Sequence, residues 1–259
     1  FDKLQIPAGD ELRNAITISN PLGEDFSIMR TISLNGMLTS LATNYNRRNK
    51  NVRLYELGNV YLPKALPLTE LPDERMMFTL GMYGDGDFFD MKGVVEEFFD
   101  QIGMHKKTEY DPKAGKTFLH PGRQALISYE GEVMGYLGEV HPAVADTYGI
   151  GTRAYVAVLD ILNVVKHASF DRKYEGIAKF PAVNRDISMV VPKEIMVGQI
   201  EHMIAQRGGK ILEHFELFDI YEGDQIEKGF KSVAYSLTFR SKEKTLEEAE
   251  INGAMNKIL

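Results

Sequence analysis

The residues of this sequence that are best suited to chemistry lie in Leu217–Ser232, LFDIYEGDQIEKGFKS. Asp219 and Tyr221 precede a polar turn, and Lys231 and Ser232 follow it. An aromatic ring on one side of a turn and a Lys-Ser pair on the other form a surface on which a nucleobase can stack. An ordinary hairpin with a surface tyrosine explains the same residues, because aromatic side chains are common on strand-rich surfaces.

Catalytic and metal-binding signatures are missing from the rest of the sequence. The six histidines, at positions 105, 120, 141, 167, 202 and 214, do not form HExxH or HxH pairs, so no metal site is expected. Neither GDGD at 84–87 nor GIG at 149–151 continues into a phosphate-binding loop, and no GxSxG motif is present. The absence of cysteine excludes disulfides, thiolate nucleophiles and cysteine-based zinc sites. We therefore predict no catalytic residue in this chain.

The composition is typical of a globular protein. The 259 residues are 44% hydrophobic and 26% charged, and no apolar run approaches the length of a membrane span. The chain opens with acidic residues rather than a signal peptide, and it starts at Phe1, so we expect a piece of a longer protein. A net charge of −7 argues against coating nucleic acid by bulk charge, so any RNA contact must be local.

The elements that position these residues fall into two predicted domains, 1–168 and 169–259. In the first, leucines and methionines at helical spacing predict a helix within Met29–Asn46, with Ser33 as its N-cap. A second helix is predicted over 87–101, and strands over 52–61, 76–83, 117–128, 132–139 and 154–162. Strands in mixed order with few helices indicate an α+β fold with an antiparallel sheet.

The second domain has the predicted order β-α-β-β-α. Strands are expected over 186–191, 211–221 and 231–240, with helices over 195–206 and after Thr245, where Thr245 and Glu248 form a capping box. This order is the ferredoxin-like βαββα(β) unit lacking its last strand. It predicts that one strand keeps an unpaired edge and that the last helix packs on the small sheet.

Four segments of the second domain resemble one family. The runs KFPAVNRD at 179–186, LFDIYEG at 217–223, GFKSVAYSLTFR at 229–240 and KTLEEAEIN at 244–252 closely resemble the anticodon-binding domain of the bacterial phenylalanyl-tRNA synthetase β subunit. Upstream, residues 20–61, HPGRQA at 120–125 and GYLGEVHP at 135–142 are similar to the catalytic-like core of the same subunit. The resemblance covers essentially the whole chain.

The resemblance implies a class II synthetase-like core that has lost its active site. Met29–Ile32 keeps an arginine, Arg30, but has Ile32 where the family's working sites place a glutamate. The late strand at 154–162 lacks the glycine-rich end and the arginine of a phosphate clamp. Amino-acid activation would then belong to the α subunit, with Arg30 in an ion pair or a subunit contact and Arg185 in a structural role.

For the second domain the resemblance implies binding to the anticodon region of the tRNA for phenylalanine. Tyr221 would stack on the first anticodon base, Ser232 would pack on its other face and Asp219 would accept hydrogen bonds from a guanine edge. Lys231, Arg240 and Lys242 are candidate phosphate contacts, with solvated surface charge as the alternative. Residues 171–259 carry 13 basic and 15 acidic side chains, so we expect weak affinity unless other subunits hold the tRNA in register.

The whole enzyme implied by the resemblance is a cytoplasmic (αβ)2 heterotetramer that uses ATP and magnesium. This part of it is expected to bind no cofactor, no DNA and no membrane.

A free-standing ferredoxin-like ligand sensor is an alternative that predicts a polar pocket within 174–259. An enzyme using His120, Arg123 and His141 is another, and it predicts a deep cleft where they converge. The subunit interpretation predicts an open apolar face on 15–60 or 76–165.

Overall fold

The computed structural model describes residues 1–104, 106, 108–171, 174 and 176–259. The chain divides into two compact units, Phe1–Arg172 and Lys173–Leu259, each with its own sheet and core. The predicted boundary, between residues 168 and 169, lies just before this division. Within the described parts of the chain, every helix is too short or too polar to cross a membrane.

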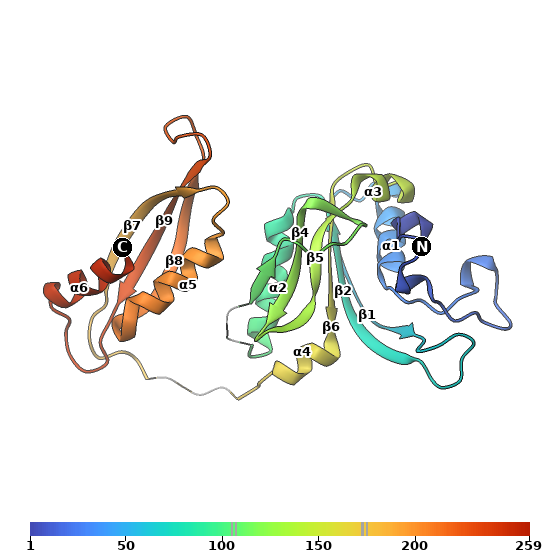
Figure 1. Ribbon diagram of the computed structural model, residues 1–259, viewed down its shortest axis with the longest axis horizontal. Helices are drawn as coiled ribbons and strands as arrows, with labels where there is room; N and C mark the ends of the chain where they lie inside the picture. Colours follow the sequence, from blue (N-terminus) through green and yellow to red (C-terminus); the bar gives the residue numbers. More distant parts are fainter. Residues whose placement is uncertain (105, 107, 172–173, 175) are drawn as a thin grey trace. The chain divides into compact units, whose positions relative to one another are not determined.

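The first unit is built on a six-stranded antiparallel sheet in the order β1-β2-β6-β5-β4-β3 (Figure 1). Its strands are β1 Val52–Leu62, β2 Asp73–Tyr83, β3 Glu109–Asp111, β4 Leu119–Tyr129, β5 Glu132–Val140 and β6 Ala154–Asp160. β6, whose apolar run is buried along nearly its whole length, pairs with β2 on one side and β5 on the other. The predicted α+β class is confirmed.

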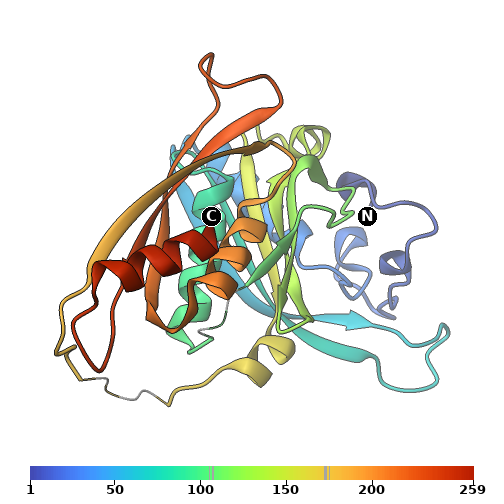
Figure 2. The same cartoon turned by 60° about the vertical axis from the view of Figure 1, so that its left-hand side comes forward.

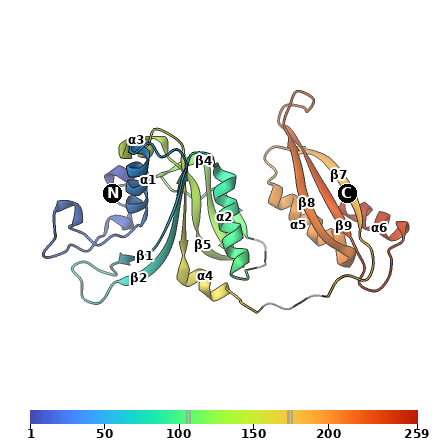
Figure 3. The ribbon, with the colours of Figure 1, turned by 180° about the vertical axis from the view of Figure 1, so that it is seen from behind.

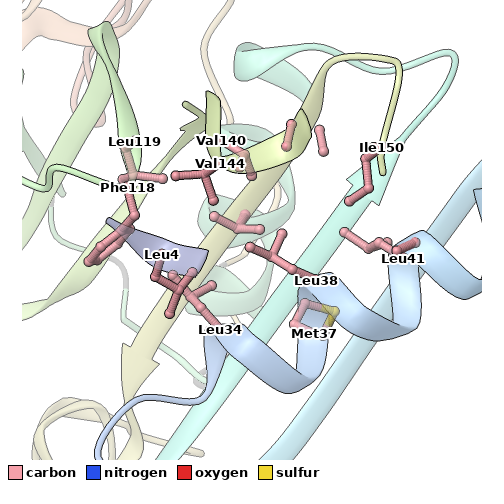
Figure 4. Close-up of a cluster of buried hydrophobic side chains, with 14 of the residues drawn as sticks. Leu4, Leu34, Met37, Leu38, Leu41, Phe118, Leu119, Val140, Val144 and Ile150 are labelled. Atoms are coloured by element: carbon pink, nitrogen blue, oxygen red, sulfur yellow. The ribbon is translucent and has the colours of Figure 1, made fainter. Parts of the chain in front are cut away.

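Helices cover both faces of this sheet (Figures 1 and 3). The helices are α1 Leu34–Asn46, α2 Phe88–Gln101, α3 Pro142–Tyr148 and α4 Ile161–His167, and short 3-10 turns occupy Asp2–Leu4, Glu11–Arg13 and Glu24–Phe26. The turn at Asp2–Leu4, α1 and α3 pack on one face around Leu34, Leu38 and Val144 (Figure 4). α2 and α4 pack on the other face around Val95 and Phe99. These helices cover much of both faces of the large sheet.

Close backbone approach fixes α1 on the sheet. A side chain at Gly81 of β2 would place its Cβ 2.6 Å from the Met37 sulfur, so a larger residue there would push the Met37 side chain aside. Ser33 is the N-cap as predicted, but its hydroxyl makes no cap bond; it lies 2.6 Å from the Thr79 hydroxyl in the core. α1 starts at Leu34, directly after the predicted N-cap, and upstream of it Ile28 forms an isolated bridge with Thr17.

The second unit is a three-stranded antiparallel sheet in the order β7-β9-β8 with two helices. Its elements are β7 Val183–Pro192, α5 Val197–Gly208, a 3-10 turn Gly209–Ile211, β8 Leu212–Tyr221, β9 Phe230–Phe239 and α6 Glu248–Ile258. α5 and α6 lie together in front of the strands in Figure 2 and share one core with Val233, Tyr235 and Leu237 of β9. The predicted βαββα order is confirmed: α6 packs on the sheet, and β7 pairs on one side only among the described residues.

Two local predictions fail. α6 is capped by Glu247 and Glu250 in a reciprocal box, not by Thr245 and Glu248, because Leu246 is buried and the helix begins only after it. The predicted strand at 154–162 ends at Asp160, whose carboxylate accepts from the backbone of Leu162 and so starts α4.

Candidate nucleic-acid interface

The small sheet has one covered face and one exposed face. In β9 the odd-numbered side chains from Val233 to Phe239 are fully buried under the helices. The even-numbered side chains and their cross-strand neighbours point the other way, and we call this surface the open face. It comprises Asn184, Asp186, Ser188 and Val190 of β7, His214, Glu216, Asp219 and Tyr221 of β8, and Ser232, Ala234, Ser236 and Thr238 of β9.

The structure brings Tyr221 and Ser232 together on the open face. They are directly opposite each other in the β8–β9 ladder, and Asp219 lies two residues earlier on the same face, opposite Ala234. Tyr221 is 41% exposed, and the Ser232 hydroxyl lies 3.2 Å from that of Ser188. An exposed ring, a small hydroxyl and a carboxylate in adjacent positions can stack on a base and accept from its edge.

The turn after Tyr221 is shaped around its ring. A Cβ at Gly223 would come within 2.1 Å of the Tyr221 hydroxyl oxygen, so the backbone there lies against the phenol. Lys193 donates to Glu222 at 2.7 Å, and this hydrogen bond, with the charges of Lys193 and Lys231, lowers the pKa of Glu222. The loop from 222 to 229 extends beyond the ends of β8 and β9 (Figure 2). These contacts hold the ring at the edge of the open face.

Sequence reasoning missed Phe218. The β8–β9 register shifts between Leu217 and Asp219, so Phe218 is the extra residue of a β-bulge and is 58% exposed. It is a second exposed aromatic beside Asp219. Two adjacent apolar residues, Leu217 and Phe218, break the alternation of the strand, and this break was the available signal.

The predicted phosphate contacts do not gather around Tyr221. Lys231 is only 9% exposed and belongs to the covered side of β9, so its placement does not favour a phosphate contact. Arg240 donates to Glu213 at 2.9 Å and to the Phe180 carbonyl at 3.3 Å. A strand rises about 3.3 Å per residue, which puts Arg240 about 26 Å from Ser232 along β9.

Of two further exposed lysines, only Lys228 lies near Tyr221. Lys242 is exposed, but it follows β9 at the end remote from Tyr221. Lys228 is exposed in the loop next to Tyr221, and the sequence analysis did not single it out. A nucleic-acid backbone that passes Tyr221 would reach Lys228 before it reached Arg240 or Lys242.

The two predicted structural arginines are engaged in ion pairs. Arg185 donates from Nη2 to both Glu248 oxygens at 2.8 Å, which links β7 to the first turn of α6. Arg30 donates from Nη1 to Glu56 at 2.5 Å and from Nε to the Asn59 carbonyl at 2.7 Å. A Cβ at Gly58 would fall 2.3 Å from the Arg30 guanidinium, so the backbone of β1 lies close against the guanidinium.

The side chains of the rival enzyme interpretation serve local structure. The Nδ1 atoms of His120 and His141 accept from backbone N–H groups two residues on, at 3.1 and 3.2 Å. Arg123 makes a bidentate pair with Glu139, at 2.5 and 3.0 Å, and Glu139 is 2% exposed. Burial alone would raise the pKa of Glu139, but its hydrogen bond to Arg123 and the nearby positive charges hold that pKa below its ordinary value.

Metal ligands do not cluster in the described ranges: no group of three or more His, Cys, Asp or Glu side chains there could hold an ion. His105 lies outside those ranges.

An apolar surface is exposed on the outer strands of the large sheet. Tyr55 and Leu57 of β1 are 74% and 57% exposed, on the α2 side of the sheet. Met76 of β2 is exposed beside them, and the Tyr55 ring packs against Phe78 at 5.9 Å between centroids. β1 is the outermost strand, so this surface continues to the edge of the sheet. Large exposed apolar groups of this kind mark contact surfaces.

Comparison with known proteins gives a consistent match along the chain. Residues 1–161 match the family model described as the phenylalanyl tRNA synthetase beta chain CLM domain, and residues 178–259 match the ferredoxin-fold anticodon binding domain. The phenylalanine–tRNA ligase beta subunits of Clostridium acetobutylicum and Clostridium tetani are 45% and 42% identical to it over all of its 259 residues. The chain spans 32% of the length of each of these relatives.

A solved structure is also similar. The pyrrolysyl tRNA synthetase PylSc of Desulfitobacterium hafniense aligns with a TM-score of 0.47 and 11% sequence identity, over 61% of this chain and 54% of the other.

Proposed function

This chain belongs to the phenylalanyl-tRNA synthetase β-chain family, and we propose that it contacts the anticodon region of the tRNA for phenylalanine during ATP-dependent charging. The observation that supports this role is the open face of the small sheet, where exposed Tyr221 stands opposite Ser232 and next to Asp219. Tyr221 stacks on the first anticodon base, Ser232 packs on the base from its other side, and Asp219 accepts from a guanine edge.

Charge does not dominate this interface. The open face carries the carboxylates Asp186, Glu216 and Asp219. The contact therefore depends on base stacking and on recognition of a base edge, and not on bulk electrostatic attraction for phosphates. Lys228 is the nearest exposed cation in sequence, and Lys242 serves a more distant phosphate. The domain acts when the rest of the enzyme holds the tRNA, since tethering raises its effective concentration at the anticodon.

The first unit is proposed to support assembly with the catalytic α subunit, in a cytoplasmic (αβ)2 enzyme that uses ATP and magnesium. It supplies no catalytic residue of its own. The exposed apolar surface of Tyr55, Leu57 and Met76 is the proposed contact with α. Arg30 holds β1 in place behind this surface through Glu56 and the Asn59 carbonyl.

The anticodon role is tested by aminoacylation with full-length subunits that carry Tyr221→Ala. Loss of one stack costs roughly 1–3 kcal/mol, which is about 5- to 150-fold in tRNA charging efficiency. Amino-acid-dependent pyrophosphate exchange should stay unchanged, because it does not need the tRNA. Tyr174→Ala removes another exposed tyrosine of the same unit and serves as the control. If Tyr221→Ala leaves tRNA charging unchanged, Tyr221 does not belong to the interface.

The assembly role is tested by co-purification of α with β that carries Leu57→Glu. A carboxylate introduced at this surface should sharply reduce the amount of α recovered, because the carboxylate would lose its hydration in the contact. Val190→Glu, at a position with the closely similar exposure of 56%, is the matched control on the small sheet and should recover α normally.

A further inference from the structure

A cavity of about 170 Å³ lies on the α1 side of the large sheet, on the face opposite Tyr55 and Leu57. Its floor is formed by neighbouring strands: Val60 of β1, Met77 of β2, Val158 of β6 and Tyr136 of β5. The ladder registers place these side chains on one face, since Val158 pairs with Tyr136 on one side and with Thr79 on the other. The lining is therefore mostly apolar and is held largely by paired strands of the large sheet.

Two of the three charged residues at the cavity neutralise each other. Arg75 donates from Nε to Asp160 Oδ2 at 2.7 Å. The other Asp160 oxygen accepts from Leu162 N at 3.0 Å, at the start of α4. Both groups thus have fixed partners, and together they add no net charge to the lining.

The third charged residue, Lys116, has no such partner. Its backbone N–H donates to the side-chain oxygen of buried Gln124 at 2.9 Å, which fixes this residue beside the cavity. Its ammonium lies 5.1 Å from the centre of the Tyr136 ring, and no carboxylate of the described residues forms an ion pair with it. A cation over an aromatic ring at the wall of an apolar cavity is available to an anion.

The start of α1 adds to this positive character. Thr31, Ile32 and the N-cap Ser33 line the cavity, so the positive end of a 13-residue helix lies at its wall. Ser33 makes no cap bond from its side chain, which leaves the first backbone N–H groups without that partner. The wall thus offers donors and positive potential to one end of a ligand, and hydrocarbon to the rest.

We propose that this cavity binds a small organic carboxylate with a compact apolar body, its carboxylate toward Lys116 and its body against Val60, Met77 and Val158. Two observations set the size and charge of the ligand: the volume of about 170 Å³ and the single uncompensated ammonium. A monocarboxylate fits, because one negative charge balances Lys116 while Arg75 stays paired with Asp160.

Benzoate is the test probe, with benzyl alcohol as its neutral analogue and benzylamine as its cationic analogue. Binding is measured on the 259-residue chain by calorimetry and by NMR of methyl-labelled methionines, with Met77→Leu used to assign the Met77 signal. Benzoate should bind with a Kd on the order of 1 mM, a value typical of a ligand of this size, and should shift the Met77 methyl resonance. Benzyl alcohol and benzylamine should bind about tenfold more weakly or not at all.

Two variants and one control separate the effect of the Lys116 charge from that of the cavity volume. Lys116→Met keeps the apolar stem and removes the ammonium, and it should weaken benzoate binding about tenfold. Lys113→Met changes the same charge at an exposed position nearby and should leave binding unchanged. Leu62→Phe adds volume at the cavity and should abolish the Met77 shift. No benzoate binding up to about 10 mM, equal binding of benzyl alcohol, or equal losses in Lys113→Met and Lys116→Met would each overturn the proposal.

Discussion

The six-stranded sheet of the first unit carries helices on both faces, whereas the three-stranded sheet of the second carries them on one. In the first, polar groups at strand positions are tied into pairs such as Arg123–Glu139 and Arg75–Asp160. In the second, a row of polar and aromatic side chains remains exposed on the open face. The difference shows that the number of helices packed on a sheet determines whether a whole face stays exposed to solvent.

The largest expected effect tests whether the two sheets really differ in this way. Val156→Ala and Leu159→Ala remove buried groups from opposite faces of β6, and both should destabilise the first unit, by about 1–3 and about 2–5 kcal/mol. In β9 only the covered side should respond. Leu237→Ala should cost about 2–5 kcal/mol, and Thr238→Ala on the open face should stay within about 0.5 kcal/mol.

Urea unfolding of each variant, followed with probes in each unit, measures these costs. A loss above about 2 kcal/mol for Thr238→Ala would mean that the open face is packed and would break the comparison.

The next effect concerns the sealed polar groups of the first unit. Arg123→Met leaves Glu139 buried without its bidentate partner, with Arg153 4.0 Å away, and should cost on the order of 1–3 kcal/mol. The pKa of Glu139 lies below its ordinary value of 4.5 in the folded chain, so its stabilising contribution is complete above that pH. It is lost as the pH falls through the folded pKa.

Unfolding free energies of the first unit should therefore decrease on acidification below about pH 4.5. The decrease should be shallower in Arg123→Met, because the variant no longer holds the pKa of Glu139 down. Identical pH profiles for the two proteins would show that the pair does not set this dependence.

A smaller effect is expected where the open face meets its loop. Gly223→Ala forces the Tyr221 ring to move, because the new Cβ would lie 2.1 Å from the phenol oxygen. Partial loss of the stack should weaken tRNA binding by the whole enzyme on the order of fivefold, with little change in fold stability. Filter binding measures the change, and Gly253→Ala, where no atom lies within 4 Å, is the control. Equal affinities for the two variants would argue that the ring position is unimportant.

The smallest effect is expected from the exposed ion pair of the second unit. Arg185 and Glu248 keep 35% and 67% of their side-chain surface in solvent, so Arg185→Met should cost at most about 1 kcal/mol. Added salt should shrink that cost further. Thermal unfolding of the second unit at low and high ionic strength measures both. A cost as large as that of Arg123→Met would contradict the contrast drawn between the two units.

Much of this architecture was predictable from the sequence, because local patterns agree with the fold. The helix stripe of α1, the acidic start of α2 at Asp87 and the βαββα order of the second unit all follow from spacing. The pairing of Tyr221 with Ser232 also follows, since both flank one turn. These features depend on contacts between residues that are near each other in sequence.

Features in which two local signals conflict, or which depend on distant contacts, were not predicted. Helix α4 lies in an apolar run that is typical of a strand, and only the capping carboxylate of Asp160 marks where β6 ends and α4 begins. Lys231 reads as a surface charge, yet the alternation of β9 places it on the covered side. The cavity beside Lys116 joins four strands and the start of α1, and no single segment of sequence indicates it.

The bulge at Phe218 determines which side chains of β8 lie on the open face. Before it, the even positions His214 and Glu216 lie on the open face; after it, the odd positions Asp219 and Tyr221 do. If Phe218 took an ordinary place in the strand, strict alternation would put Asp219 and Tyr221 on the helix side, so the bulge is what keeps both on the open face. The presence of one extra residue at 218 thus matters more for the position of Tyr221 than the identity of its side chain.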